Sequence, residues 1–247
     1  MEKAEDIPSD VFKKPSLFWL ATEGQRALLE FGRSFPYRML RKSSSGDGHP
    51  VLVLPGFMAS DFSTSPLRSF IDKMGYQSHP WGIGRNYGNQ QYLDVLTEKL
   101  EQIFLTSRRR TSIIGWSLGG VYAREIAKRR PKLTRQIITL GSPFAGLTQP
   151  NHARWIYDII TGGKGTDDLD EDLLTNLTQP APVPTTAIFS KEDGVVPWEA
   201  CCEITESNIH QNIQVRGSHI GLGVNPVVLE IIADRLQYSK ENWSRYE

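Results

Sequence analysis

Short apolar stretches alternate with amphipathic segments along most of this chain. Six apolar stretches have the length and residue types of strands, and they lie at 51–54, 76–80, 111–114, 136–140, 185–189 and 212–215. Between some of them apolar residues recur at helical spacing, most clearly over 93–103 and 121–127. This alternation predicts a three-layer α/β fold in which helices cover both faces of a mostly parallel sheet.

Two prolines mark helix boundaries in this region. Pro131 ends the helix that the 121–127 pattern predicts. Asn225 and Pro226 are residue types favoured at the N-cap and in the first turn of a helix, so they predict a final helix that runs to Leu236.

A separate helical pattern precedes the alternating region. Apolar residues recur at helical spacing from Leu17 to Phe31, and a polar linker follows at 42–48. We therefore divide the chain into an N-terminal helical appendage with its linker, 1–48, and a main domain, 49–247. The apolar stripe favours packing of the helix against its own domain, with a membrane-surface helix or a dimerisation helix as alternatives.

The alternation is interrupted once, at about 146–184. About forty residues are too many for a simple connection between elements in a compact domain. Two groups of apolar residues at helical spacing lie in this segment, around 155–160 and 169–177. We expect a small helical cap inserted over the sheet.

Composition narrows the class of partner. The 247 residues fit one large core, and 28 Lys and Arg balance 28 Asp and Glu, so no overall field favours nucleic acid or an anionic membrane. The charged N-terminus lacks a signal-peptide pattern, and no stretch is long enough for an integral membrane segment. The only cysteines, Cys201 and Cys202, are adjacent, which is consistent with a reducing compartment. These features predict a cytoplasmic protein with a small, weakly charged partner.

The strongest chemical signal is a serine between glycines. The strand at 111–114 continues into Gly-Trp-Ser-Leu-Gly-Gly at 115–120 and then into a helix, which matches the nucleophile-elbow pattern Gly-x-Ser-x-Gly. A tight strand-to-helix turn lifts the serine clear of the sheet and leaves no room for neighbouring side chains. The helix N-terminus favours negative charge that develops there. Ser117 is therefore the predicted nucleophile.

With this motif in place, the region 49–236 resembles the α/β-hydrolase superfamily, in particular its bacterial lipase-like and esterase-like members. A second landmark is Val-Leu-Val-Leu-Pro-Gly-Phe at 51–57, which resembles the strand and loop that supply half of the oxyanion hole. Many members carry His-Gly where this chain has Pro55 and Gly56. The resemblance implies that the backbone N–H groups of Phe57 and Leu118 hold the oxyanion.

The resemblance also implies the chain order serine, acid, histidine. His219 follows the last predicted strand, whereas His210 precedes it, so His219 is the expected base. Asp193 follows the strand at 185–189 in a pattern similar to the family's Asp-x-x-Val-Pro, and it is the expected acid. Its neighbour Glu192 is expected to be solvated. The acidic residues of the cap stay open as alternative acids: Asp167, Asp168 and Asp170.

Together these features predict a serine hydrolase that cleaves acyl substrates, with carboxylic esters favoured, through an acyl-enzyme. No cofactor and no metal are expected, because no His/Cys metal cluster or nucleotide-binding glycine loop is present. An acyltransferase with the same triad and a non-catalytic ligand-binding protein are the alternatives, and a homo-oligomer stays open. Apolar side chains of the cap would contact the acyl group: Trp155, Ile156, Ile159 and Ile160. Trp81 is a further candidate for the pocket, with core packing as its alternative.

Overall fold

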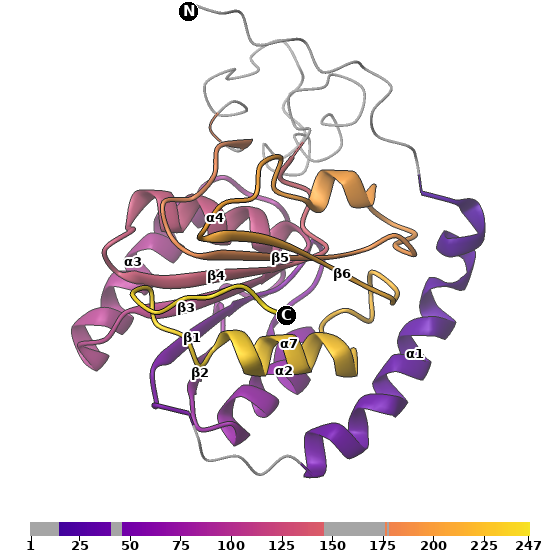
Figure 1. Ribbon diagram of the computed structural model, residues 1–247, viewed down its shortest axis with the longest axis horizontal. Coiled ribbons are helices and arrows are strands. Elements are labelled where there is room, and N and C mark those ends of the chain that lie inside the picture. The colour runs from indigo at the N-terminus through magenta and orange to yellow at the C-terminus, as the bar shows by residue number, and fades with distance from the viewer. Residues whose placement is uncertain (1–14, 41–45, 146–175, 177) are drawn as a thin grey trace, which may run out of the picture.

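One parallel sheet forms the centre of the protein in the computed structural model, which describes residues 15–40, 46–145, 176 and 178–247 (Figure 1). Six strands lie in the order β2-β1-β3-β4-β5-β6, and each neighbouring pair is parallel. Their bounds are β1 Pro50–Leu54, β2 Gln77–His79, β3 Thr111–Trp116, β4 Thr134–Leu140, β5 Thr185–Ser190 and β6 His210–Val215. All six predicted strands are confirmed within a few residues.

Helices cover both faces of the sheet, as the alternating pattern predicts. The helices α3 (Tyr92–Ser107) and α4 (Leu118–Arg129) pack on one face, and α2 (Asp61–Lys73) and α7 (Pro226–Arg235) pack on the other. The sequence pattern did not single out α2, because the first half of this helix is mostly polar and contains Pro66.

Consecutive residues of β1 contribute alternately to two separate apolar layers. In β1, Val51 and Val53 pack toward α2 and α7, whereas Leu52 and Leu54 pack toward α3 and α4. All four side chains are buried, which explains why β1 reads as a continuous apolar run rather than an alternating one. Burying one such side chain contributes about 1.5–3 kcal/mol, so the two layers hold the sheet and its helices together.

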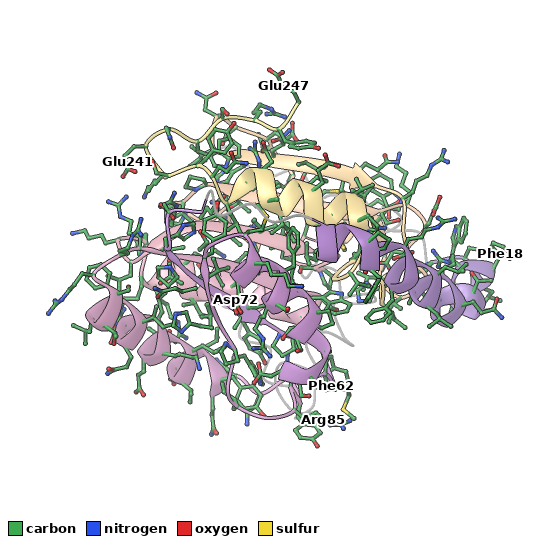
Figure 2. All side chains as sticks on the ribbon, turned by 90° about the horizontal axis from the view of Figure 1, so that it is seen from below. Phe18, Phe62, Asp72, Arg85, Glu241 and Glu247 are labelled. Atoms are coloured by element: carbon green, nitrogen blue, oxygen red, sulfur yellow. The ribbon has the colours of Figure 1, made fainter. Side chains whose placement is uncertain are left out.

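The N-terminal helix α1 (Leu17–Leu40) lies along one side of the molecule, and its orientation reverses the expected one (Figure 1). Its polar residues Glu23, Glu30 and Ser34 are buried against the domain. Its large apolar side chains are exposed instead, and Figure 2 shows Phe18 at the periphery of the molecule. We call this set the outer face of α1: Leu17, Phe18, Leu20, Leu28, Leu29 and Phe35. The helix packs against its own domain, as predicted, but it does so through hydrogen bonds of its carboxylates, and the apolar stripe faces outward.

The start of α7 confirms the predicted N-cap at Asn225. Asn225 has an extended backbone, and its Oδ1 accepts hydrogen bonds from the N–H groups of Val227 and Val228 at 3.0 and 3.4 Å. Its Nδ2 donates to the carbonyl oxygen of Arg216 at 2.9 Å. One side chain thus begins the helix and ties it to the loop after β6.

Replacing this N-cap residue should destabilise the fold measurably. We expect Asn225→Ala to lower the free energy of unfolding by about 1–2 kcal/mol, because two helix N–H groups lose their acceptor. Asn225→Asp keeps the accepting oxygen and loses only the bond to Arg216, so its loss should be smaller. Denaturant unfolding of the wild type and the two variants measures the order of their stabilities. An alanine variant as stable as the wild type would contradict the N-cap assignment.

Candidate active site

The turn between β3 and α4 holds Ser117 in a strained conformation. Ser117 has φ 52° and ψ −125°, a region that costs a non-glycine residue on the order of 1–3 kcal/mol. Two backbone hydrogen bonds fix it, from its own N–H to the carbonyl oxygen of Leu140 at 2.8 Å and from the N–H of Gly120 to its carbonyl oxygen at 2.9 Å. The serine is therefore presented at the end of β3 by a turn that the surrounding backbone enforces.

The glycines of the turn are required by close packing. A Cβ on Gly115 would lie 2.3 Å from the Cα of Gly120, and one on Gly119 would lie 2.3 Å from the carbonyl oxygen of Leu54. A Cβ on Gly120 would meet the Oγ of the buried Ser142. Because real Cβ atoms do not approach other atoms this closely, larger residues would force β3, α4 and the neighbouring strands apart.

A histidine and an aspartate pair beside this turn. The Nδ1 atom of His219 lies 2.6 Å from Oδ2 of Asp193, and both residues are buried. The other carboxylate oxygen, Oδ1, accepts hydrogen bonds from the N–H groups of Val195 and Val196, each at 2.8 Å. Both oxygens of Asp193 thus accept hydrogen bonds, and one of them orients the imidazole ring.

Two contacts connect this pair to the serine turn. The indole Nε1 of Trp116, next to Ser117 in the chain, donates to the carbonyl oxygen of His219 at 3.0 Å. A Cβ on Gly141, which follows β4, would lie 3.1 Å from Nδ1 of His219 and 3.3 Å from Oδ2 of Asp193. Since β4 lies between β3 and β5, the loops after these strands meet at the carboxyl edge of the sheet. His210 is the first residue of β6, and its Nε2 bonds to the carbonyl of Ala181.

The loop after β1 reaches the same edge. A Cβ on Gly56 would lie 3.1 Å from the Cβ of Ser117, so only a small residue fits there. Among the described residues, the backbone N–H groups of Phe57 and Leu118 have no hydrogen-bond acceptor. Within this part of the chain, both donors are left for a ligand atom.

Asn86 holds this loop in place. Its Nδ2 donates to the carbonyl oxygen of Pro55 at 2.9 Å, and its backbone carbonyl accepts from the N–H of Met58 at 2.7 Å. Its own N–H donates to the carbonyl of Ala59 at 2.8 Å. The side chain of Asn86 is fully buried and supports the loop from behind.

The remaining sequence candidates fall into two groups. Trp81 is fully buried in the core beside Tyr92 and Tyr122, so core packing describes it. The cap residues lie outside the described part of the chain: Trp155, Ile156, Ile159, Ile160, Asp167, Asp168 and Asp170. Glu192 is half-buried beside Asp193.

Two carboxylates of α1 that belong to none of the sequence motifs contact the same loops. Glu23 accepts from the N–H groups of Gly194 at 2.8 Å and His219 at 3.1 Å through Oε1, and from Ile220 at 3.1 Å through Oε2. Glu30 accepts from the N–H of Ser218 at 2.8 Å, and burial raises the pKa of its carboxyl. Their spacing of seven residues, on one side of a helix whose apolar residues lie elsewhere, was the available sequence signal.

A second Asp-His-Ser set lies at the opposite edge of the sheet. Nδ1 of His49 lies 2.6 Å from Oδ1 of Asp47, and its Nε2 lies 2.8 Å from the Oγ of Ser112. His49 and Ser112 are both 0% exposed, so no substrate reaches them. Burial, followed by the charge of Arg135, lowers the pKa of His49 to about 4. This set fastens the linker to β3, and distance alone would not separate it from a catalytic set.

Other chemistries find little support in the described residues. No group of three or more His, Cys, Asp or Glu side chains in this part of the chain is placed to hold a metal. Burial raises the pKa of the Cys202 thiol to about 12 and that of Cys201 well above its ordinary value, so neither is a ready thiolate nucleophile. Within the same residues, no helix has both the length and the apolar character needed to cross a bilayer.

Comparison with known proteins identifies the fold. No family model and no curated protein matches the sequence. Among solved structures, Aspergillus fumigatus lipase B superposes with a TM-score of 0.58 at 15% identity, over 78% of this chain and 53% of that one. A pyrethroid hydrolase from Sphingobium faniae JZ-2 gives 0.55 at 14% identity over 78% and 99% of the two chains. Paleococcus ferrophilus monoacylglycerol lipase gives 0.54 at 11% identity over 75% and 94%.

These likenesses, together with the parallel sheet and its two helical layers, show that the chain has the α/β-hydrolase fold. The chain spans about half of the length of lipase B, with 53% covered. At these identities the comparison shows the fold alone.

The buried His49 should make the protein sensitive to mild acid. Its folded-state pKa of about 4 is below the ordinary 6.5, so the unfolded chain takes up a proton first as the pH falls. The stabilisation is present above pH 6.5 and is lost between pH 6.5 and about 4, with a ceiling of about 3 kcal/mol. We expect His49→Gln to be less stable at pH 7 but to lose less stability over this range. Denaturant unfolding at a series of pH values measures both slopes, and equal slopes would contradict the prediction.

Proposed function

We propose that this protein is a serine hydrolase of carboxylic esters, with Ser117 as nucleophile, His219 as general base and Asp193 as its carboxylate partner. The observation that carries the proposal is the strained Ser117, at φ 52°, at the same carboxyl edge of the sheet as a buried His219–Asp193 pair whose Nδ1 and Oδ2 atoms lie 2.6 Å apart. Strain of this kind persists only where the surrounding structure enforces it, and it concentrates at functional sites.

The proposed first step is acylation. The hydroxyl Oγ of Ser117 attacks the ester carbonyl carbon while Nε2 of His219 takes the hydroxyl proton. The negative charge that develops on the carbonyl oxygen is bound by the N–H groups of Phe57 and Leu118, and the N-terminus of α4 adds its dipole. Collapse of the tetrahedral intermediate breaks the bond to the leaving alkoxide, which receives the proton from His219. The products of this step are the free alcohol and an acyl-enzyme on Ser117.

The second step returns the enzyme to its resting state. A water molecule attacks the acyl carbonyl as His219 takes its proton, the bond to Ser117 Oγ breaks, and the proton passes to the serine. Throughout, Asp193 keeps Nδ1 of His219 protonated, so that Nε2 carries the lone pair needed by the base. The N–H groups of Val195 and Val196, which donate to Oδ1 of Asp193, hold the carboxylate in this orientation.

The class of substrate rests on the site and on the similar folds. Two backbone N–H donors without described acceptors, those of Phe57 and Leu118, support binding of a carbonyl oxygen, and the fold is shared with two lipases and a pyrethroid hydrolase. The apolar residues at 155–160 are the proposed contacts for the acyl group, because ligand pockets are mostly lined by apolar side chains. Product analysis with and without an added alcohol separates hydrolysis from acyl transfer by the same residues.

Covalent labelling tests the nucleophile. We expect a fluorophosphonate to add to Ser117 and a p-nitrophenyl ester to be hydrolysed. Ser117→Ala should abolish the adduct and lower kcat by about 10⁴-fold or more, since the covalent step is lost. Peptide mass spectrometry locates the adduct.

The second Asp-His-Ser set supplies a matched control. Ser112→Ala removes the buried serine of that set, and it should keep both labelling and ester hydrolysis. An adduct that persists in Ser117→Ala, or no adduct on the wild-type protein, would overturn the proposed function.

A further inference from the structure

The outer face of α1 is an apolar surface that no element in the described part of the chain covers. Leu17 is 81% exposed, Leu28 is 71% exposed and Phe35 is 58% exposed. Scattered apolar residues on a surface need no explanation, but a contiguous stripe along a helix marks an interaction site. Figure 1 shows α1 at the margin of the molecule, with the sheet and the other helices on its inner side.

The acidic residues of α1 do not lie on this face. The two acidic residues of α1, Glu23 and Glu30, are buried on its inner side, whereas Arg33 is exposed. The sequence over 13–42 contains those two acids and these basic residues: Lys13, Lys14, Arg26, Arg33, Arg38, Arg41 and Lys42. The overall balance of 28 positive and 28 negative residues therefore conceals an excess of basic residues in this part of the sequence, of which Arg26 pairs with the buried Glu23 and Arg33 is exposed.

We infer that the outer face of α1 binds the surface of an anionic lipid bilayer. An amphipathic helix with an apolar side and basic residues lies in the plane of the interface, with apolar side chains at the acyl boundary and cations among the headgroups. A second copy of the chain fits less well, because Glu23 and Glu30 are buried on the inner side of α1 and leave Arg33 without an acidic partner between two paired α1 helices.

Vesicle flotation tests this inference independently of the proposed hydrolysis. The protein would be the full chain with Ser117→Ala, so that vesicle lipid is not consumed. We expect it to float with phosphatidylcholine vesicles that contain phosphatidylserine, and to float less with phosphatidylcholine alone or at high ionic strength.

Two matched double variants locate the surface. Leu28→Ser with Phe35→Ser should weaken binding by about tenfold or more, because two apolar groups no longer enter the interface. Val95→Ser with Leu105→Ser changes two exposed apolar residues of α3 and should leave vesicle binding as it was. Melting temperatures show that both variants fold.

Three outcomes would overturn the inference: no binding to the anionic vesicles, equal binding by the two double variants, or a wild-type dimer that the α1 variant dissociates. Light scattering of the same samples reports the third outcome, in which a second copy covers the face.

The inner side of α1 carries a second, independent inference, which rests on the proposed function. The geometry points to Glu23 as a positioning residue for the reaction. Its carboxylate accepts hydrogen bonds from the backbone N–H groups of Gly194 and His219. Gly194 follows the proposed acid Asp193, and His219 is the proposed base. Glu23 is also paired with Arg26 at 2.9 Å.

Glu23 thereby sets the relative position of two loops that meet through one imidazole–carboxylate contact. A Cβ on Gly194 would lie 2.4 Å from the backbone N of Leu20, so α1 packs directly on the acid loop. Small displacements of catalytic groups lower the rate of the chemical step more than they weaken substrate binding. Glu23 touches neither the substrate nor the reacting atoms, so it acts through Asp193 and His219.

The test is the split between kcat and KM on a soluble p-nitrophenyl ester. Glu23→Gln keeps the shape and removes one acceptor oxygen, and it should lower kcat by about tenfold with KM within about twofold. The rate of fluorophosphonate labelling should fall in parallel. Ser34→Ala, which removes a buried hydroxyl bonded only within α1, is the control and should keep the wild-type kcat.

All assays would be run well below the melting temperature of each variant. A wild-type kcat in folded Glu23→Gln, or an effect on KM alone, would overturn the role of Glu23 while leaving the proposed function standing. An inactive, unlabelled wild-type protein would instead remove the proposed function, and the role of Glu23 with it.

Discussion

The close backbone approach at the turn after β3 is the constraint on which the rest of the structure depends. Gly115, Gly119 and Gly120 let β3, α4 and the loop after β1 come together at distances that no side chain permits. The same approach holds Ser117 at a positive φ and places it at the N-terminus of α4. The two apolar layers on either side of the sheet supply the stabilisation that offsets this strain.

A buried polar network joins the N-terminal helix to this edge. Glu23 and Glu30 accept backbone N–H groups from the loops after β5 and β6, so α1 is attached by charge-assisted hydrogen bonds rather than by its apolar stripe. A backbone N–H group that is buried without an acceptor lowers the stability of the fold, and the carboxylates of α1 supply the acceptors for these loops. The consequence is a helix with a polar inner side, which holds the two loops, and an apolar outer side.

The two Asp-His-Ser sets show what sheet topology adds to local geometry. Both contain a histidine 2.6 Å from an aspartate, yet His49 and Ser112 lie fully buried near the amino ends of the strands. In a parallel sheet the loops that form sites gather at the carboxyl ends. His219 and Asp193 belong to that edge, beside the turn that carries Ser117, and this position rather than the distance distinguishes them.

The sequence by itself predicted the six strands, the mostly parallel sheet and the turn at Ser117, because apolar periodicity and the glycine pattern are local signals. Asp193 and His219 were selected through the chain order that the family resemblance implies, since each follows a recognisable strand. Only the tertiary structure decided which side of α1 faces inward, since the periodicity of a helix reports an apolar stripe but not what covers it. It alone also revealed the contacts of Glu23 and Asn86, because hydrogen bonds to the backbone of distant loops leave no trace in local composition.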